Sequence, residues 1–324
     1  MTVLVFGAGY IGAALIDACL RDGERVVALE SGFATDMAAI ARLAVVGDFT
    51  LVRGDVRDRA VVDEAFRVAG NVAAVHLLAA QASASPDAAT PEFTEEVNLR
   101  GPRHVLEAAV AHATTCGTTP PPVVYGSSFH CYGPGLEGVV DETRPYGAQG
   151  DLSHLSKVYA EKLGEMHAHR DGITFAPVRL GIVHGVGPVL KRDLRFVTVP
   201  HAFCLRRLAG TPVTVSAAGS RPLAFCHLDD AVSALRLAGA GLAPGTYAPA
   251  NAVTEVLTAH EVRDIVDAVA RAAGIRVPDD GPATPVAARF AVASRLHAAG
   301  WRPRRVMREA ITEVLDAYRH QVPA

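Results

Sequence analysis

A glycine turn near the start of the chain constrains its fold more than any other feature. Thr2–Phe6 has the pattern of a strand, Gly7, Gly9 and Gly12 follow with the spacing G-x-G-x-x-G, and a helical pattern then runs to Arg21. In this context the first glycine permits a tight turn, the second lets backbone approach a pyrophosphate, and the third allows close helix–strand packing. The helix N-terminus adds partial positive charge toward the phosphates. The turn therefore predicts a dinucleotide-binding site.

The rest of the first half repeats this alternation of strand and helix. Helices are predicted at Thr35–Val45, Ala60–Ala69, Glu92–Ala113 and Leu155–Arg170. The strands between them are predicted at Arg25–Glu30, Thr50–Arg53, Val72–Leu78, Val123–Gly126 and Thr174–Leu180. Such alternation is typical of an α/β fold with a doubly wound parallel sheet, the Rossmann architecture. We expect residues 1–180 to form the dinucleotide-binding domain.

The pattern changes in the second half, where glycine- and proline-containing loops separate shorter elements. Helices are predicted at Pro200–Ala209, Asp229–Ala238, Ala259–Ala273 and Val306–Arg319, and short strands at Val213–Ser216 and Leu223–Cys226. We expect residues 181–324 to form a smaller α/β substrate-binding lobe, with elements of 220–250 returning to the first domain.

Composition excludes several classes of function. The 324 residues carry a formal net charge of −3, which gives no electrostatic footprint for nucleic acid or an anionic membrane. No stretch approaches the ~20 apolar residues of a membrane span, and the N-terminal run lacks the basic region of a signal peptide. The five cysteines form no C-x-x-C and the 13 histidines no H-E-x-x-H, so we expect neither disulfides nor a metal site. A reducing cytoplasm fits this cysteine usage.

Glu30 indicates which dinucleotide is bound. It ends the second predicted strand, where a carboxylate can accept hydrogen bonds from a ribose diol and would repel a 2′-phosphate. Residues 31–36 contain no Arg or Lys that could neutralise such a phosphate. The sequence therefore favours NAD over NADP, although a solvated charge at a strand end would give the same pattern.

Further motifs follow in order along nearly the whole chain, and together they resemble the extended short-chain dehydrogenase/reductase family. Its members are NAD-dependent epimerases and dehydratases, most of which act on nucleotide sugars. The matching segments are Gly54-Asp55-Val56-Arg57-Asp58, His76-Leu77-Leu78-Ala79-Ala80-Gln81, Val97-Asn98-Leu99-Arg100-Gly101, Ser127-Ser128-Phe129-His130-Cys131-Tyr132-Gly133, Arg179-Leu180-Gly181, Phe225-Cys226-His227-Leu228-Asp229-Asp230 and Gly300-Trp301-Arg302-Pro303.

The resemblance implies a set of cofactor-binding residues and an assembly. The helices at 92–113 and 155–170 correspond to the family's usual dimer surface, so a homodimer is implied. The residues implied to bind NAD are Gly7, Gly9, Tyr10, Ile11, Gly12, Glu30, Ser31, Asp55, Val56, Leu78, Ala79, Ala80, Gln81, Asn98, Lys157 and Leu180.

The active-site motif departs from the family at Ser153. Ser128 matches the family's catalytic hydroxyl and Lys157 its ribose-binding lysine, but the tyrosine four residues before the lysine is replaced by Ser153. A phenol has a pKa near ~10 that an adjacent cation can lower, whereas a serine hydroxyl is a far weaker acid on a shorter side chain. Loss of a positioned acid–base group typically costs ~10²–10⁴ in rate. Another group must therefore carry the proton, or the reaction needs none.

Two residues are candidates to replace the phenol. His130 lies on the turn where dehydratase members carry acidic catalytic residues, and an imidazole titrates near pH ~6.5. A loop histidine bonded to backbone is the other interpretation. Tyr146 precedes Ser153 in a loop that could fold inward. His154 is expected to turn away, since one helical step rotates a side chain by ~100°.

The substrate side of the motif is weaker. Ile182 stands where nucleotide-sugar enzymes usually carry an asparagine that holds the diphosphate, and His184 replaces an aromatic residue. Arg192 and Arg221 could bind a phosphate or carboxylate. We therefore expect an NAD-dependent epimerase or dehydratase acting on a secondary alcohol or carbonyl of a small polar substrate, with a nucleotide sugar as one option. A non-redox enzyme on this scaffold and a non-catalytic NAD-binding protein are the alternatives.

Overall fold

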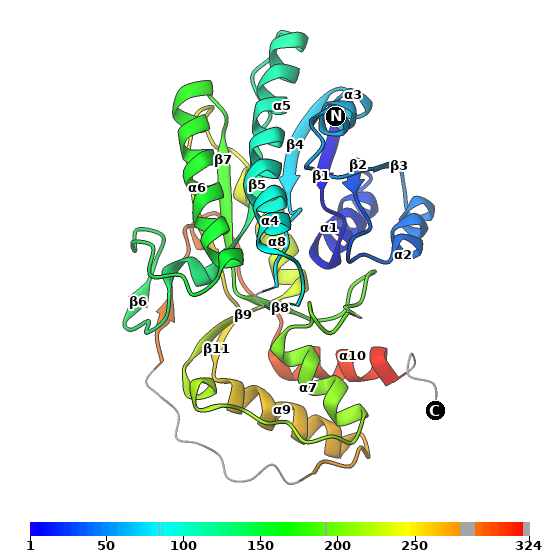
Figure 1. The fold of residues 1–324 in the computed structure, drawn as a ribbon, viewed down its shortest axis with the longest axis vertical. Helices are drawn as coiled ribbons and strands as arrows, with labels where there is room; N and C mark the ends of the chain where they lie inside the picture. Colours follow the sequence, from blue (N-terminus) through cyan, green and yellow to red (C-terminus); the bar gives the residue numbers. More distant parts are fainter. Residues whose placement is uncertain (84, 86, 192, 279–288, 320–324) are drawn as a thin grey trace.

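The computed structural model describes residues 1–83, 85, 87–191, 193–278 and 289–319. A seven-stranded parallel sheet lies at its centre, which confirms the predicted fold class (Figure 1). The strand order reverses between β1 and β4, and ligands of doubly wound sheets bind at the carboxyl edge beside such a switch point. In spatial order the strands are β10 (Ala250–Ala252), β7 (Phe175–Leu180), β5 (Val123–Ser128), β4 (Val72–Leu77), β1 (Thr2–Phe6), β2 (Arg25–Glu30) and β3 (Phe49–Arg53).

Helices cover both faces of this sheet. β1 is buried at every position because side chains on both of its faces meet helices. One face packs against α3 (Arg59–Ala69), α5 (Gly101–Cys116) and α6 (Leu152–Asp171). The other packs against α1 (Tyr10–Arg21), α8 (Leu228–Ala238), α2 (Met37–Ala41) and the 3-10 turn η1 (Arg42–Val45). Two elements from the second half of the chain, α8 and β10, thus belong to the layers of the large sheet.

A smaller lobe lies at one end of the sheet (Figure 1). Its three-stranded sheet has the order β11 (Glu255–Leu257), β9 (Leu223–His227) and β8 (Ile182–His184), and its helices are α7 (Val199–Leu208), α9 (Ala259–Ala272) and α10 (Met307–Arg319). These helices pack on one another around an apolar cluster. Because β8 begins two residues after β7 ends, the chain passes directly from the large sheet into the lobe. The short elements β6 (Val139–Val140), β12 (Ala291–Val292), η3 (Phe129–Tyr132), η4 (Ala217–Ser220) and η5 (Arg295–His297) complete the assignment.

The long helix predicted at Glu92–Ala113 is interrupted. It consists of α4 (Pro91–Glu95), a π-helical turn η2 (Glu96–Arg100) and α5. Pro102 explains the interruption, because proline has no N–H to donate and its ring would clash with the carbonyl of Asn98 four residues earlier. A wider turn relieves this clash.

The strand predicted at Val213–Ser216 was wrong. This segment is irregular in the structure. Its alternating apolar residues, Val213 and Val215, instead pack into the cluster formed with α7 and α9. The alternation of apolar and polar residues in this segment therefore comes from packing of the two valines against helices, and not from pairing with another strand.

Candidate functional site

The glycine turn has the geometry of a phosphate cradle. Gly7 has a φ of +91°, and a Cβ placed on it would lie 2.5 Å from the backbone nitrogen of Ala79. A Cβ placed on Gly12 would lie 2.0 Å from the carbonyl oxygen of Gly7. A Cβ at Gly9 would meet nothing nearer than the Thr35 hydroxyl at 3.6 Å. Gly7 and Gly12 thus allow tight packing, whereas Gly9 leaves open space at the N-terminus of α1. The N–H groups of that first turn can point to a phosphate there.

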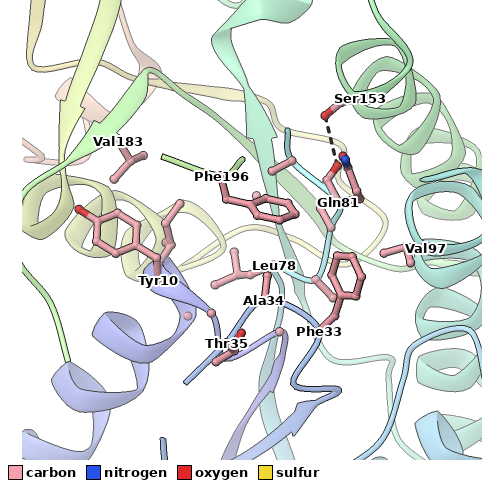
Figure 2. Close-up of a pocket in the computed structure, with 18 of the residues that line it drawn as sticks. Tyr10, Phe33, Ala34, Thr35, Leu78, Gln81, Val97, Ser153, Val183 and Phe196 are labelled. Atoms are coloured by element: carbon pink, nitrogen blue, oxygen red, sulfur yellow. Dashed lines mark hydrogen bonds between the residues drawn. The ribbon is translucent and has the colours of Figure 1, made fainter. Parts of the chain in front are cut away.

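A cavity of about 530 Å³ lies against this turn, along the carboxyl ends of β1, β2, β4 and β5, and residues 180–183, 189–191, 193 and 196–199 also line it (Figure 2). Its size lies within the usual range of cofactor and ligand pockets. The predicted cofactor residues that line it are Gly7, Gly9, Tyr10, Ile11, Gly12, Glu30, Ser31, Asp55, Val56, Leu78, Ala79, Ala80, Gln81, Lys157 and Leu180. The open space at Gly9, the volume of the cavity and its lining residues fit a dinucleotide.

Glu30 lies on the cavity wall with its carboxylate fixed. Its Oε2 accepts a hydrogen bond from the backbone N–H of Ala8 at 2.8 Å, and its Oε1 accepts one from Gly32 at 2.8 Å. The residue is only 7% exposed, and among the described residues no Arg or Lys pairs with it. The remaining lone pairs can accept hydrogen bonds from a ribose diol, and the unneutralised charge disfavours a 2′-phosphate.

Asn98 lies behind the cavity wall rather than on it. Its Oδ1 accepts a hydrogen bond from the Gln81 N–H at 2.8 Å, and its Nδ2 donates to the Gln81 carbonyl at 2.8 Å and to the Ser156 hydroxyl at 2.9 Å. The π-helical turn η2 carries Asn98 into this position. Asn98 therefore positions the Gln81 backbone, which itself lines the cavity.

Lys157 and Ser153 both line the cavity from α6, but they make different contacts. The Lys157 ammonium donates to the carbonyl of Gly126 at 2.7 Å and lies 4.8 Å from the centre of the Tyr125 ring. Burial lowers the pKa of Lys157 to about 8. The Ser153 hydroxyl donates to the Gln81 carbonyl at 3.2 Å (Figure 2). Ser153 is thus engaged with backbone.

Ser128 and two histidines form another part of the wall. Ser128 Oγ, at the end of β5, accepts a hydrogen bond from the His130 N–H at 3.2 Å and lies 3.3 Å from His130 Nδ1. The His130 ring stacks on the His154 ring with a centroid distance of 4.4 Å. Burial, with a smaller effect of His154, lowers the pKa of His130 to about 4, so His130 is neutral at neutral pH. Ser128, His130 and His154 all line the cavity.

The position of His154 corrects the expectation that it turns away. Asp151 caps α6 by accepting the His154 N–H at 2.9 Å, and its other carboxylate oxygen lies 2.5 Å from His154 Nδ1. The cap folds the imidazole of the first helical turn back toward His130. The sequence analysis did not use the one signal present, which is an aspartate three residues before a histidine at the start of a helix.

Tyr146 lies outside the cavity. Its hydroxyl donates to Glu161 at 2.9 Å and lies 3.1 Å from the hydroxyl of Tyr247. Glu161 is fully buried, and its two carboxylate oxygens share the Nε–H of Arg179 at 3.1 Å each, while Oε2 also accepts a hydrogen bond from Nη2 at 2.7 Å. Burial, followed by the charge of Glu161, raises the pKa of Tyr146. Tyr146 therefore belongs to a buried polar network between the sheet and its loops.

The predicted substrate residues are scattered. Ile182 lines the cavity. His184 is fully buried, with its ring 5.5 Å from that of His227, and burial lowers its pKa to about 3. Arg221 is exposed and does not line the cavity. Arg192 lies outside the described residues.

Sequence reasoning missed Lys191. It lines the cavity, its ammonium lies 4.8 Å from the centre of the Tyr10 ring, and burial lowers its pKa to about 8. Within the part of the chain that the structure describes, no carboxylate pairs with it. The signal was present, because the chain has only three lysines among its many basic residues, Lys157, Lys162 and Lys191. Two of these three lysines line the cavity.

An aromatic bridge closes one side of the cavity. The Phe33 ring, after β2, lies with its centroid 4.5 Å from that of Phe93 in α4. Its centroid lies 6.1 Å from that of Phe196, which is in the loop between β8 and α7 (Figure 2). The Ser83 hydroxyl donates to the Arg195 carbonyl at 2.5 Å, which ties the same loop to the segment after β4. The loop of the small lobe thus spans the dinucleotide side of the cavity.

The described residues suggest neither a membrane span nor a metal centre. None of the helices in the described ranges is long and apolar enough to cross a membrane. The same ranges contain no group of three or more His, Cys, Asp or Glu side chains placed to hold a metal ion.

Comparison with known proteins identifies the family. A family model described as the NAD dependent epimerase/dehydratase family matches residues 3–248. The UDP-glucose 4-epimerase of Mycolicibacterium smegmatis is 26% identical over 99% of both chains. The crystal structure of Thermus thermophilus UDP-glucose 4-epimerase in complex with NAD is 28% identical, with a TM-score of 0.78 over 99% of this chain and 100% of that one.

A structure of UDP-glucose 4-epimerase from Thermotoga maritima with UDP-glucose has 20% identity and a TM-score of 0.81 over 99% of each chain, which is a likeness of fold. The family match covers most of the chain, and it agrees with the glycine turn and cavity described above. The chain therefore belongs to the NAD-dependent epimerase/dehydratase family, and it is an NAD-dependent enzyme of the extended short-chain dehydrogenase/reductase type.

Proposed function

We propose that this enzyme transiently oxidises a secondary alcohol of a small polar substrate, as an epimerase or dehydratase does. The observation that carries this proposal is that Ser128 and Lys157 line the same cavity as the phosphate cradle at Gly9. Bound NAD supplies a reversible hydride acceptor there. Lys157 would hold the nicotinamide ribose, and the Ser128 hydroxyl would orient the reacting oxygen.

The favoured substrate class is a nucleotide sugar or another anionic sugar derivative. Lys191 presents an ammonium group to the cavity without a carboxylate partner among the described residues, and such a group can bind a phosphate. The curated relative from Mycolicibacterium smegmatis is a UDP-glucose 4-epimerase. Because Ile182 offers no hydrogen bond at the cavity wall and Arg221 is exposed, we propose that Lys191 is the main contact for the anionic group.

We further propose that imidazole replaces the phenol missing at position 153. His130 Nδ1 lies within hydrogen-bond distance of Ser128 Oγ, at 3.3 Å. If the neutral His130 ring carries its proton on Nδ1, Ser128 Oγ accepts hydrogen bonds from both the backbone N–H and the ring N–H of His130. The serine proton is then free to donate to a substrate oxygen. His130 then orients Ser128, and His130 and His154 together supply polar groups in place of the tyrosine hydroxyl that is missing at position 153.

The test is to incubate the purified enzyme with NAD and a panel of nucleotide-diphosphate sugars, sugar phosphates and free sugars. The expected result is a near-ultraviolet signal of reduced nicotinamide, or an epimerised or dehydrated product, with at least one anionic member. Ser128→Ala should reduce the rate ~10²-fold or more, because it removes a positioned donor. NAD binding without turnover across the panel would contradict the proposal, and product formed without reduced nicotinamide would indicate a non-redox reaction.

We also propose that the enzyme is a homodimer that works in the cytoplasm. Leu155, Tyr159 and Met166 are 51%, 43% and 43% exposed and follow one another at helical spacing on one face of α6. An exposed apolar stripe of this kind marks a protein interface. The five cysteines are all free thiols, which suits a reducing compartment.

A further inference from the structure

The cavity offers few groups that could exchange a proton with a substrate next to Ser128. The one phenol that lines it, among the described residues, is Tyr10, whose hydroxyl donates to the carbonyl of Gly185 at 2.6 Å and whose pKa is raised by burial. Glu30 ends β2 and Asp55 follows β3, both on the dinucleotide side, and the third carboxylate among the described lining residues, Asp193, pairs with Arg195 at 2.6 Å. The Lys191 ammonium lies over the Tyr10 ring. The groups that remain on the Ser128 side are His130, His154 and Lys157.

Two of these three are poorly suited to accept a proton. The pKa of His130 is lowered to about 4, so the ring binds a proton weakly, and its Nδ1 already faces Ser128 Oγ. The Lys157 ammonium is protonated below pH about 8 and donates to the Gly126 carbonyl. His154 differs in its contacts, because its Nδ1 faces the Asp151 carboxylate and not Ser128.

The surroundings of His154 are those of a positioned acid–base group. Its Nδ1 lies 2.5 Å from Asp151 Oδ2, and one face of its ring stacks on His130 with an interplanar angle of 20°. The carboxylate accepts a hydrogen bond from Nδ1–H and thereby fixes the tautomer with a lone pair on Nε2. The side chain is 24% exposed and lines the cavity, and the described residues offer Nε2 no hydrogen-bond partner.

We infer that His154 is the catalytic acid–base and that Asp151 is its positioning residue, an inference that rests on the proposed function. In the oxidation step, the O–H bond of a substrate secondary alcohol breaks and its proton goes to Nε2 of His154. The carbon-bound hydrogen leaves with its electron pair to NAD, so that a ketone remains. The reverse step returns both, and an imidazole does this more readily near neutral pH than a serine hydroxyl can.

The first experiment measures the His154 tautomer by NMR of the NAD-loaded enzyme with ¹⁵N-labelled histidine. The expected signal is a protonated Nδ1 and an unprotonated Nε2. Asp151→Asn retains the helix cap, because asparagine caps as well as aspartate, but its side chain can donate to Nδ1 and should shift the tautomer. A protonated Nε2 in the unaltered enzyme, or no change in Asp151→Asn, would overturn the role of Asp151.

The second experiment measures NAD reduction in a single turnover with a substrate that the unaltered enzyme oxidises. His154→Gln should slow this step ~10²–10⁴-fold. Asp151→Asn should slow it at least about tenfold, by favouring the wrong tautomer. The dissociation constant of NAD should stay within about twofold of the unaltered value in both variants, since neither residue is placed as a cofactor ligand.

The controls are His169→Gln and Asp171→Asn at the far end of α6. His169 is exposed, and Asp171 makes a similar contact with His167 at 2.5 Å. Both controls should turn over at the unaltered rate. If His154→Gln oxidises substrate as fast as the controls, the inference is wrong and the proposed function stands. If even the unaltered enzyme reduces no NAD across the panel, the proposed function fails and the inference fails with it.

Discussion

Burial gives the two lysines of the cavity an unusual range of titration. The pKa of Lys191 is lowered to about 8, so its ammonium charge is present below that pH and is lost as the pH rises through it. We expect KM for an anionic substrate to rise above pH 8, because the anion loses its partner. In Lys191→Gln, KM should be roughly 10–100-fold higher at neutral pH and should show no such rise. Steady-state kinetics between pH 6.5 and 9 provide the measurement.

The control for this prediction is Lys162→Gln on the exposed face of α6. Lys162 pairs with Glu165 at 2.8 Å outside the cavity, so its removal should leave KM and its pH dependence unchanged. An unchanged KM in Lys191→Gln would show that the anionic group binds elsewhere.

For single residues, sequence patterns predict the position of those whose place depends only on the few residues around them in the chain. Gly7, Gly12 and Glu30 lie on the first βα turn or at the end of β2, so a spacing of a few residues is enough to place them. Tyr146 and His154 are different. The direction of each side chain depends on a partner, Glu161 for the tyrosine and Asp151 for the histidine, whose geometry appears only once the chain is folded.

At the scale of elements, the π-helical turn η2 has a structural task that can be measured. Asn98 is 1% exposed and satisfies both the N–H and the carbonyl of Gln81. Asn98→Ala leaves the Gln81 N–H without its partner and the Gln81 carbonyl with the Ser153 hydroxyl alone, so the free energy of unfolding should fall by about 1–3 kcal/mol. Denaturant unfolding of the variant, with the exposed Asn71→Ala as control, tests this. Equal stability of both variants would contradict the assigned role.

The loop that carries Phe196 should govern how fast NAD leaves. Phe196→Ala removes the contact with Phe33, and the loss of one aromatic pair should speed dissociation about 2- to 10-fold. Stopped-flow displacement of bound NAD measures this rate. Leu194→Ala is the matched control, because Leu194 lies in the same loop but is 76% exposed. Equal dissociation rates in the two variants would show that the loop does not restrain the cofactor.

Six of the seven strands of the parallel sheet were predicted to within a few residues, because strands buried on both faces have short, nearly uninterrupted apolar runs, whereas the edge strand β10 was not predicted. The strand predicted at Arg25–Glu30 has the same bounds as β2. The two- and three-residue strands, such as β8 and β11, were not predicted, because so few residues carry no periodicity. The interruption before α5 could have been inferred from Pro102. The error at Val213–Ser216 arose because a segment packed beneath helices and a segment paired in a sheet can both alternate apolar and polar residues.

At the scale of the whole molecule, the stripe of Leu155, Tyr159 and Met166 predicts the state of assembly. Burying a charge in the centre of an interface costs more free energy of association than most single contacts contribute. Tyr159→Glu should therefore convert a dimer to a monomer at micromolar concentration. Light scattering coupled to size exclusion measures the mass. Glu165→Gln on the same helix is the control and should stay dimeric. A monomeric unaltered enzyme would contradict the assignment of this face.

The central claim is that this enzyme oxidises its substrate beside Ser128 and Lys157 without a phenol at position 153. The most direct measurement compares single-turnover NAD reduction in Ser153→Ala with that in Ser128→Ala. Because the Ser153 hydroxyl is hydrogen-bonded to the Gln81 carbonyl, Ser153→Ala should reduce NAD at a rate within about threefold of the unaltered enzyme. In Ser128→Ala the rate should fall ~10²-fold or more. A loss in Ser153→Ala as large as that in Ser128→Ala would contradict the account, because it would make the serine itself the proton carrier.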